Sequence, residues 1–377
     1  MTRFHLASIP AGHTPALTGL RGVAAVWVML YHLWQFAGEV PVMLGPIDLT
    51  AIFSCGYLGV DLFFVLSGFL VGGPFVQARI GGTPTPRLAA FWRRRLARVL
   101  PAYWVQILIL FAVALGNGGP SDLSVSGAIG QALLVFNLYD SGPLLNPVYW
   151  SLPVEWDYYI LLPLLALGFP SGAGRPWIVA AAVGFSISFR VACWWLFWHW
   201  PINGAEVYPW VIGLPGRLDQ FVFGMAAAWL HATGRAQRWW RPLQLGGLIV
   251  LSLMVWQISP RGDIFGKVDA PWLFWHCTLL GGAFAALVAS CAAMPGSAVL
   301  CRLLTMPVLL FSGVVSYSLY LWHFPIIQWA KPIVLGSAFP GLAWWIFVPS
   351  ICIAAATLSY AAVERPFQQL RGRWRKA

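Results

Sequence analysis

A cation and an imidazole lie within the first long apolar segment of the chain. Arg21 and His32 are eleven residues apart in a stretch that reads LTGLRGVAAVWVMLYH from Leu17. At about 100° per residue, eleven residues amount to roughly three helical turns plus 20°, so both side chains are expected on one helix face, about 16 Å apart along the axis. Such residues inside a membrane helix usually mark a substrate or proton path. The spacing predicts catalysis or transport, with a satisfied polar contact between helices as the simpler alternative.

Carboxylates from other segments are expected at a depth similar to that of His32. A carboxylate beside an imidazole sets its tautomer and supports it as a general base. The residues therefore predict an acid–base site at His32, in which Glu155 or Asp61 orients the base. The alternative for each acid is an ion pair between helices with Arg190 or Arg217. Three carboxylates fall in the outer parts of different apolar segments: Asp61, Glu155 and Asp219.

Further polar residues lie where an acceptor from the outer side would enter. Arg217 and Asp219 begin one apolar segment, and Tyr320 and His323 lie toward the outer end of another, next to Pro325. A proline beside a histidine in a membrane helix often lines a cavity. The alternative for His323 is an ordinary interfacial histidine. The candidates for an acceptor site are Arg217, Asp219, Tyr320 and His323.

A cluster of arginines precedes the third apolar segment. The stretch from Phe91 to Tyr103 reads FWRRRLARVLPAY, and Arg94, Arg95 and Arg98 (the arginine cluster) are spaced to share a helix face. Guanidinium groups bind phosphate oxygens bidentately, as a nucleotide-bearing donor from the cytosol would require. Lipid anchoring and topology are the alternative role.

The elements that must position these residues are membrane helices. Of 377 residues, 59% are hydrophobic, only 9% are charged and 23 are tryptophan, a composition unlike that of soluble domains. We expect an all-α polytopic bundle in a single domain, residues 1–377, and a further interfacial helix at 127–138. The expected spans are 16–36, 52–76, 99–115, 148–168, 177–199, 215–232, 243–258, 272–293, 309–330 and 343–364.

The distribution of basic residues predicts the orientation. Most of them fall in the loop 79–98, the tail 366–377 and other segments on the same side. Because cytoplasmic loops are enriched in lysine and arginine, both termini are expected to be cytoplasmic. The formal charge of +11 then reflects topology and anionic lipids rather than nucleic acid. Six scattered cysteines lack metal-ligand spacing, so we expect no metal, no disulfide and no permanently bound cofactor.

Six ordered motifs resemble those of the acyltransferase-3 family, membrane enzymes that O-acylate extracytoplasmic glycans and some small natural products. Each motif alone is weak, but together they cover most of the chain. Two positions depart from the usual pattern: Trp156 follows the motif glutamate, and the acid of the sixth helix is followed by Gln220. The motifs begin at Leu17 (LTGLRGVAA, extending to His32), Gly59 (GVDLFFVLSGF), Phe91 (with Arg95 and Arg98), Trp150 (WSLPVE), Ser316 (SYSLYLWH) and Val363 (VERPF).

The resemblance implies an acyl-CoA donor, acetyl-CoA by default, that reaches the arginine cluster and Arg21 from the cytosol. Its acyl group would pass to a hydroxyl of a glycan, a lipid-linked sugar or a small acceptor. His32 would act as general base, Glu155 or Asp61 would support it, and Arg21 would contact the donor or the developing negative charge. Direct transfer and an acyl-histidine intermediate both remain open.

Two other classes of function are compatible with the same residues. In a transporter or exporter of a lipid-linked or anionic metabolite, Arg21 and His32 would form a coupling path without bond formation. In a membrane sensor or assembly protein the fold would persist without chemistry, which the intact pair argues against. Turnover of acyl-CoA would distinguish an acyltransferase from the transporter.

Overall fold

The computed structural model describes residues 14–116, 123–138, 142–171, 174–199, 210–259, 273–335, 341 and 343–373. Helices make up most of this part of the chain, and a short antiparallel ribbon pairs Met43 with Asp48. The elements η2 and η3 are 3₁₀ helices, whereas η6 and η7 are π-helical. In chain order the elements are α1 (Pro15–Phe36), β1 (Met43–Leu44), β2 (Ile47–Asp48), α2 (Thr50–Ser54), η2 (Gly56–Leu58), α3 (Gly59–Gly81), α4 (Leu88–Gly116), α5 (Val125–Leu133), η3 (Pro147–Trp150), α6 (Ser151–Leu167), α7 (Trp177–His199), α9 (Leu214–Ala232), α10 (Arg235–Ile258), α11 (Leu273–Ala293), α12 (Val299–Leu304), α13 (Pro307–Val314), α14 (Ser316–Leu335), η6 (Ala343–Phe347), α16 (Val348–Ser359), η7 (Tyr360–Glu364) and α17 (Arg365–Arg373).

Every apolar segment expected to span the membrane overlaps a helix, which confirms a polytopic helical membrane protein. Seven helices in the described part are long and apolar enough to cross a bilayer, or eight if α13 and α14 form one broken span. The remaining two expected spans correspond to α6, which has 17 residues, and α9, which carries Arg217 and Asp219. The count of ten and the cytoplasmic termini stay predictions. The segment expected at 243–258 begins earlier, at Arg235, and bends at Trp239.

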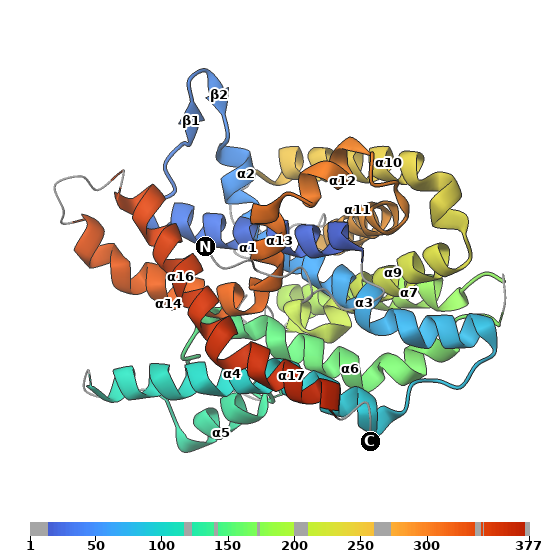
Figure 1. The fold of residues 1–377 in the computed structure, drawn as a ribbon, viewed down its shortest axis with the longest axis horizontal. Coiled ribbons are helices and arrows are strands. Elements are labelled where there is room, and N and C mark those ends of the chain that lie inside the picture. The colour runs from blue at the N-terminus through green and yellow to red at the C-terminus, as the bar shows by residue number, and fades with distance from the viewer. Residues whose placement is uncertain are drawn as a thin grey trace. The chain divides into compact units, whose positions relative to one another are not determined.

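Figure 1 labels the α-helices and strands along the chain. Residue contacts divide the chain into two compact units that interleave along the sequence, and each is described by itself. Unit 1 comprises the residues up to Tyr31, Val40–Thr85 and Asp157–Val314. Unit 2 comprises His32–Glu39, Pro86–Trp156 and the residues from Val315 onward.

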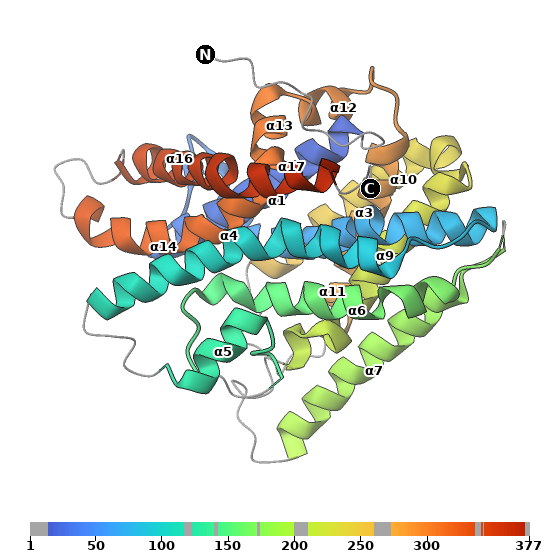
Figure 2. The ribbon, with the colours of Figure 1, turned by 60° about the horizontal axis from the view of Figure 1, so that its bottom comes forward.

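Glycines let the backbones of unit 1 touch. A Cβ on Gly68 of α3 would lie 2.0 Å from the Phe221 carbonyl oxygen, and a Cβ on Gly224 of α9 would lie 2.0 Å from the Val65 carbonyl oxygen. Helices can approach this closely only where both carry small residues. The motif glycine Gly68 therefore joins α3 to α9, which lie side by side (Figure 2).

The first motif uses its glycines in the same way. A Cβ on Gly19 would meet the Leu304 carbonyl oxygen at 1.8 Å, and one on Gly22 would meet the Leu309 carbonyl oxygen at 2.3 Å. The N-terminal part of α1 is therefore pressed against α12 and α13. Gly19 and Gly22, which flank Arg21, thus serve helix packing.

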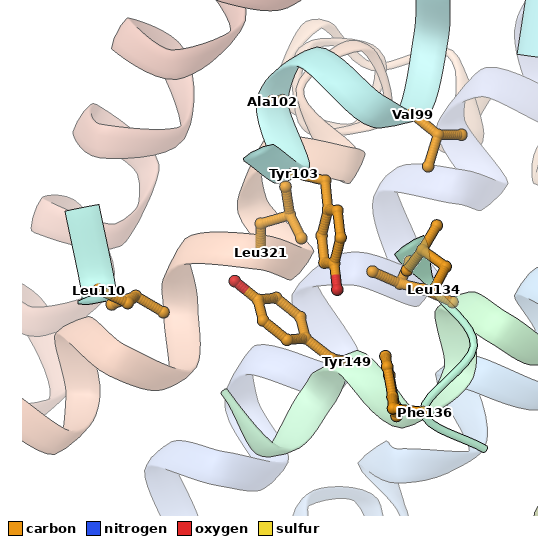
Figure 3. Packing of buried hydrophobic residues seen from close by; sticks show 9 residues of the cluster. Val99, Ala102, Tyr103, Leu110, Leu134, Phe136, Tyr149 and Leu321 are labelled. Carbon is orange, nitrogen blue, oxygen red and sulfur yellow. The ribbon is translucent and has the colours of Figure 1, made fainter. Parts of the chain in front are cut away.

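Unit 2 is organised around α14, which packs against α16 and α4. Its core includes the buried rings of Tyr103 and Tyr149, which meet edge to face with centroids 4.8 Å apart. Figure 3 shows both rings beside Leu321 of α14. The Tyr103 hydroxyl donates to the carbonyl of Gln131 in α5, 2.7 Å away. The helix expected at 127–138 thus occurs as α5 and is tied to α4.

A proline explains the polar groups buried next to α14. Pro325 has no N–H, so the carbonyl of Leu321, four residues earlier, loses its helical hydrogen bond. Two buried amides replace it: Gln106 Nε2 donates at 2.6 Å and Asn146 Nδ2 at 2.9 Å. Tyr149 in turn donates to Gln106 Oε1, 2.8 Å away. In an apolar environment a carbonyl that has lost its helical hydrogen bond must find another donor. The two amides supply it and hold the turn from Leu319 to His323 in place.

Candidate functional site

Two histidines from opposite ends of the sequence meet in unit 2. His32, near the end of α1, places its Nδ1 3.1 Å from Nε2 of His323 in α14. The His323 ring is fully buried, and its Nδ1 lies 3.0 Å from the carbonyl oxygen of Leu319. Both nitrogens of His323 therefore engage protein atoms, and one of them engages His32. We call these two residues the histidine pair.

Aromatic rings surround the histidine pair. Phe324 meets the His32 ring edge to face at 5.1 Å, and the Tyr320 ring centroid lies 5.9 Å from that of His323. The Tyr320 hydroxyl donates to the carbonyl of Val148 at 2.8 Å and lies 2.7 Å from Ser151 Oγ. Tyr320, expected as an acceptor-site residue, thus anchors α14 to the WSLPVE motif.

Two other motifs contact the SYSLYLWH motif of α14 within unit 2. Ser151, in the motif that begins at Trp150, reaches Tyr320, and Glu364 of the last motif accepts a hydrogen bond from Ser318 at 2.5 Å. Glu364 is buried and lies in the π-helical turn η7. Since π-helical turns often occur at functional sites, Glu364 joins the candidate residues, although sequence reasoning noted only its motif.

Glu155 lies in unit 2 as well, one helical turn after Ser151 in α6, and is partly buried. Arg21 is partly buried in the unit 1 part of α1, which runs unbroken from Pro15 to Phe36. Arg21 and His32 therefore lie on one continuous helix, as their spacing predicted.

Asp61 forms an ion pair with an arginine in unit 1. An ion pair links its Oδ1 to Nη1 of Arg217, and Gln220 Nε2 donates to the same oxygen at 2.6 Å. Gln220 also donates to the carbonyl of Cys277, 3.1 Å away. All three polar side chains are buried. The ion-pair alternative thus holds for Asp61, and the pair links α3 to α9.

A second buried ion pair occupies the same unit. Arg190 Nη2 lies 2.6 Å from Asp219 Oδ2, and the Thr278 hydroxyl donates to that oxygen at 2.5 Å. Arg190 Nε also donates to the carbonyl of Ser186 at 3.0 Å. The ion-pair alternative therefore holds for Asp219 too. Removing one partner of such a pair leaves an uncompensated buried charge, which costs about 3–5 kcal/mol.

The arginine cluster lies in α4 of unit 2. Arg95 and Arg98 continue the helix stripe of the buried residues Phe91 and Ala102, whereas Arg93 is exposed. The side chains of the cluster are partly buried. Arg95 and Arg98 thus lie on the stripe of α4 that faces the protein, and their binding of a ligand stays a prediction.

Among the predicted site residues, the structure places His32 in contact with His323 and Asp61 in contact with Arg217. Unit 2 contains the histidine pair, Tyr320, Glu155 and the arginine cluster, whereas unit 1 contains Arg21, Asp61, Arg217 and Asp219. Within the described ranges no group of three or more histidine, cysteine or acidic residues is placed to hold a metal. Acceptor specificity is expected to depend on outer-loop residues around 116–147, 200–214 and 259–271. Of these, 117–122, 139–141, 200–209 and 260–271 fall outside the described residues, as do 374–377 of the basic tail.

Sequence reasoning missed the buried amides and hydroxyls that complete these networks. A signal was available for Gln106 and Asn146, because Pro325 predicts that the carbonyl of Leu321 needs another donor. No comparable signal pointed to Gln220 or Thr278, since uncharged polar residues in membrane helices have no fixed spacing.

The chain is similar to bacterial proteins named for O-acetyl transfer. It is 28% identical over 391 residues to "O-acetyltransferase OatA" of Staphylococcus aureus (strain NCTC 8325 / PS 47), a match that covers 95% of this chain and 57% of the relative. It is 26% identical over 404 residues to a "Putative O-acetyltransferase" of Staphylococcus aureus (strain COL), covering 95% of this chain and 58% of the relative. The chain therefore spans less than two thirds of the length of these curated relatives. No solved structure matches it.

A family model described as "Acyltransferase domain" matches residues 14–364. This range contains five of the six motifs in full and ends at Glu364, the second residue of the sixth. The chain belongs to the acyltransferase-3 family.

Proposed function

We propose that this protein is a membrane O-acyltransferase that moves an acyl group, acetyl by default, from cytosolic acyl-CoA to a hydroxyl of an envelope or exported glycan or a related acceptor. Its place would be a bacterial inner membrane. The observation that carries the proposal is the histidine pair: His32 lies on the same helix as Arg21 and has a buried hydrogen-bond partner, His323 of α14. Family membership and the O-acetyltransferase names of the relatives support the reaction class.

The chemistry requires a base and a site for the phosphates of the donor. In the proposed reaction His32 takes the proton of the acceptor hydroxyl as its oxygen attacks the thioester carbonyl. The C–S bond then breaks, an ester forms and CoA leaves as the thiolate, which takes up a proton. Arg21 lies eleven residues before His32 on α1, about 16 Å along the helix axis, so its proposed role is contact with the donor rather than with the oxyanion that develops near His32.

The arginine cluster is the proposed phosphate-binding element. Arg95 and Arg98 lie on the stripe of α4 that faces the protein, where bidentate guanidinium contacts to phosphate oxygens are specific as well as strong. A donor thioester bound there would approach from the cytosol under the predicted orientation. Glu155 is the carboxylate of unit 2 that we propose supports the site.

The decisive experiment measures release of free CoA thiol by the purified protein in lipid nanodiscs. Acetyl-CoA and a mixture of glycan acceptors are supplied, and wild type is compared with His32→Ala. We expect acceptor-dependent release in wild type and a loss of roughly 10²- to 10⁴-fold in the variant, the usual contribution of a general base. An acyl-enzyme trapped with radiolabelled acetyl-CoA would identify a two-step route.

His231→Ala is the matched control. His231 is a partly buried histidine near the end of α9, hydrogen-bonded to Gln237 and remote in sequence from every motif. Its replacement is expected to leave CoA release unchanged. Full activity of a folded His32→Ala protein would refute the assignment of the base. No release by wild type with any acyl-CoA would instead favour the transporter, to be tested by uptake of labelled metabolite into proteoliposomes.

A further inference from the structure

We infer that His323 is a positioning residue that selects the tautomer of His32, so that Nε2 of His32 is the nitrogen that takes the proton. This inference rests on the proposed function and assigns to a histidine the orienting role that the sequence assigned to a carboxylate. It also replaces the expectation that His323 contacts the acceptor, since both nitrogens of His323 engage protein atoms.

The first step concerns the proton on His323. Its Nδ1 lies 3.0 Å from the carbonyl oxygen of Leu319. A carbonyl oxygen only accepts hydrogen bonds, so Nδ1 must carry a hydrogen. In the neutral ring, Nε2 of His323 is then an acceptor.

The second step transfers this constraint to His32. The acceptor Nε2 of His323 lies 3.1 Å from Nδ1 of His32, so Nδ1 of His32 donates and carries the hydrogen of that ring. The lone pair of neutral His32 then resides on Nε2. In many enzymes a carboxylate orients the histidine that acts as general base. Here His32 is the base, and the imidazole of His323 takes the place of the carboxylate.

The third step concerns rigidity. The turn of α14 around His323 is held by other parts of unit 2, because Gln106 and Asn146 both donate to the carbonyl of Leu321 and the Tyr320 hydroxyl donates to the carbonyl of Val148. A group on a turn held in this way can keep a neighbouring ring within hydrogen-bond geometry. An orienting residue needs such support.

Three substitutions of His323 separate positioning from mere packing. In His323→Gln the side-chain oxygen can take the place of Nε2 and accept from His32. In His323→Asn the amide matches Nδ1 and is too short to reach His32, and His323→Leu removes the acceptor altogether. We expect kcat to fall less than about tenfold in the glutamine variant and roughly 10²-fold or more in the other two, with KM for acyl-CoA within twofold of wild type.

A spectroscopic readout tests the tautomer without turnover. Nitrogen-15 NMR of labelled histidine in nanodiscs, with His32 assigned by difference from His32→Gln, should show a protonated Nδ1 and an unprotonated Nε2 in wild type. His323→Leu should lose this preference. The opposite tautomer in wild type would overturn the inference, and so would equal kcat in the glutamine, asparagine and leucine variants.

The two readouts distinguish this inference from the proposed function. If wild type shows no acyl transfer but His32 has the expected tautomer, the proposed function fails while the hydrogen-bond assignment stands. If transfer occurs and the tautomer is reversed, the function stands and the positioning role fails. Should His323→Leu not fold, the comparison of the glutamine and asparagine variants decides.

Discussion

The two units solve the problem of buried polar groups in opposite ways. In unit 1, two arginines are neutralised by two aspartates, Arg217 by Asp61 and Arg190 by Asp219. In unit 2, the polar groups around α14 are joined by hydrogen bonds of amides, hydroxyls and imidazoles, in which the histidine pair takes part.

The difference separates structural from chemical roles. A charge that is fully compensated by a neighbouring ion holds helices together but has little capacity left for a substrate. A neutral imidazole held by another imidazole keeps its ability to accept a proton. The ion pairs of unit 1 are therefore interpreted as supports, and the histidine pair of unit 2 as the reactive element, with His32→Ala as the change that abolishes transfer.

The comparison predicts that the largest loss of stability comes from breaking an ion pair in unit 1. Asp219→Leu leaves the buried guanidinium of Arg190 without its counter-charge and should lower the free energy of unfolding by about 3–5 kcal/mol. The double variant Arg190→Leu/Asp219→Leu should recover most of the loss, because no buried charge remains. Unfolding of the detergent-solubilised protein measures both, and a single variant as stable as wild type would contradict the supporting role.

A smaller loss is expected when a neutral link of unit 2 is removed. Gln106→Leu deprives the Leu321 carbonyl of one of its two donors and should cost about 1–3 kcal/mol. In a Pro325→Ala background the helix regains an N–H for that carbonyl, so the same change should cost less. A double-mutant cycle from thermal unfolding measures the difference. Equal costs in the two backgrounds would show that Pro325 does not explain the amides.

A loss of similar size should separate two glycines on the same helix. Gly68→Ala places a Cβ 2.0 Å from the Phe221 carbonyl oxygen and forces α3 from α9, at about 1–3 kcal/mol. Gly73→Ala, whose Cβ would lie 3.6 Å from that of Ala228, should be neutral or slightly stabilising. Melting temperatures of the two variants test this, and similar values would argue against close contact at Gly68.

Much of the candidate site followed from particular residues in the sequence. The helical spacing of Arg21 and His32 predicted one shared helix, and the structure supplies it as α1. The acids in the apolar segments had two readings, and for Asp61 and Asp219 the ion pair holds. Hydropathy could not choose the partners, because each aspartate had two candidate arginines at similar depth.

Apolar length and ordered motifs depend only on the order of residues, so they suffice to predict a polytopic helical membrane protein of the acyltransferase-3 family. Tertiary structure alone decided that His323, 291 residues after His32, is its hydrogen-bond partner, and that Gln220 and Thr278 complete the ion pairs. These contacts depend on which helices pack together and at what rotation. Local spacing constrains neighbours within one helix and says nothing about side chains on another.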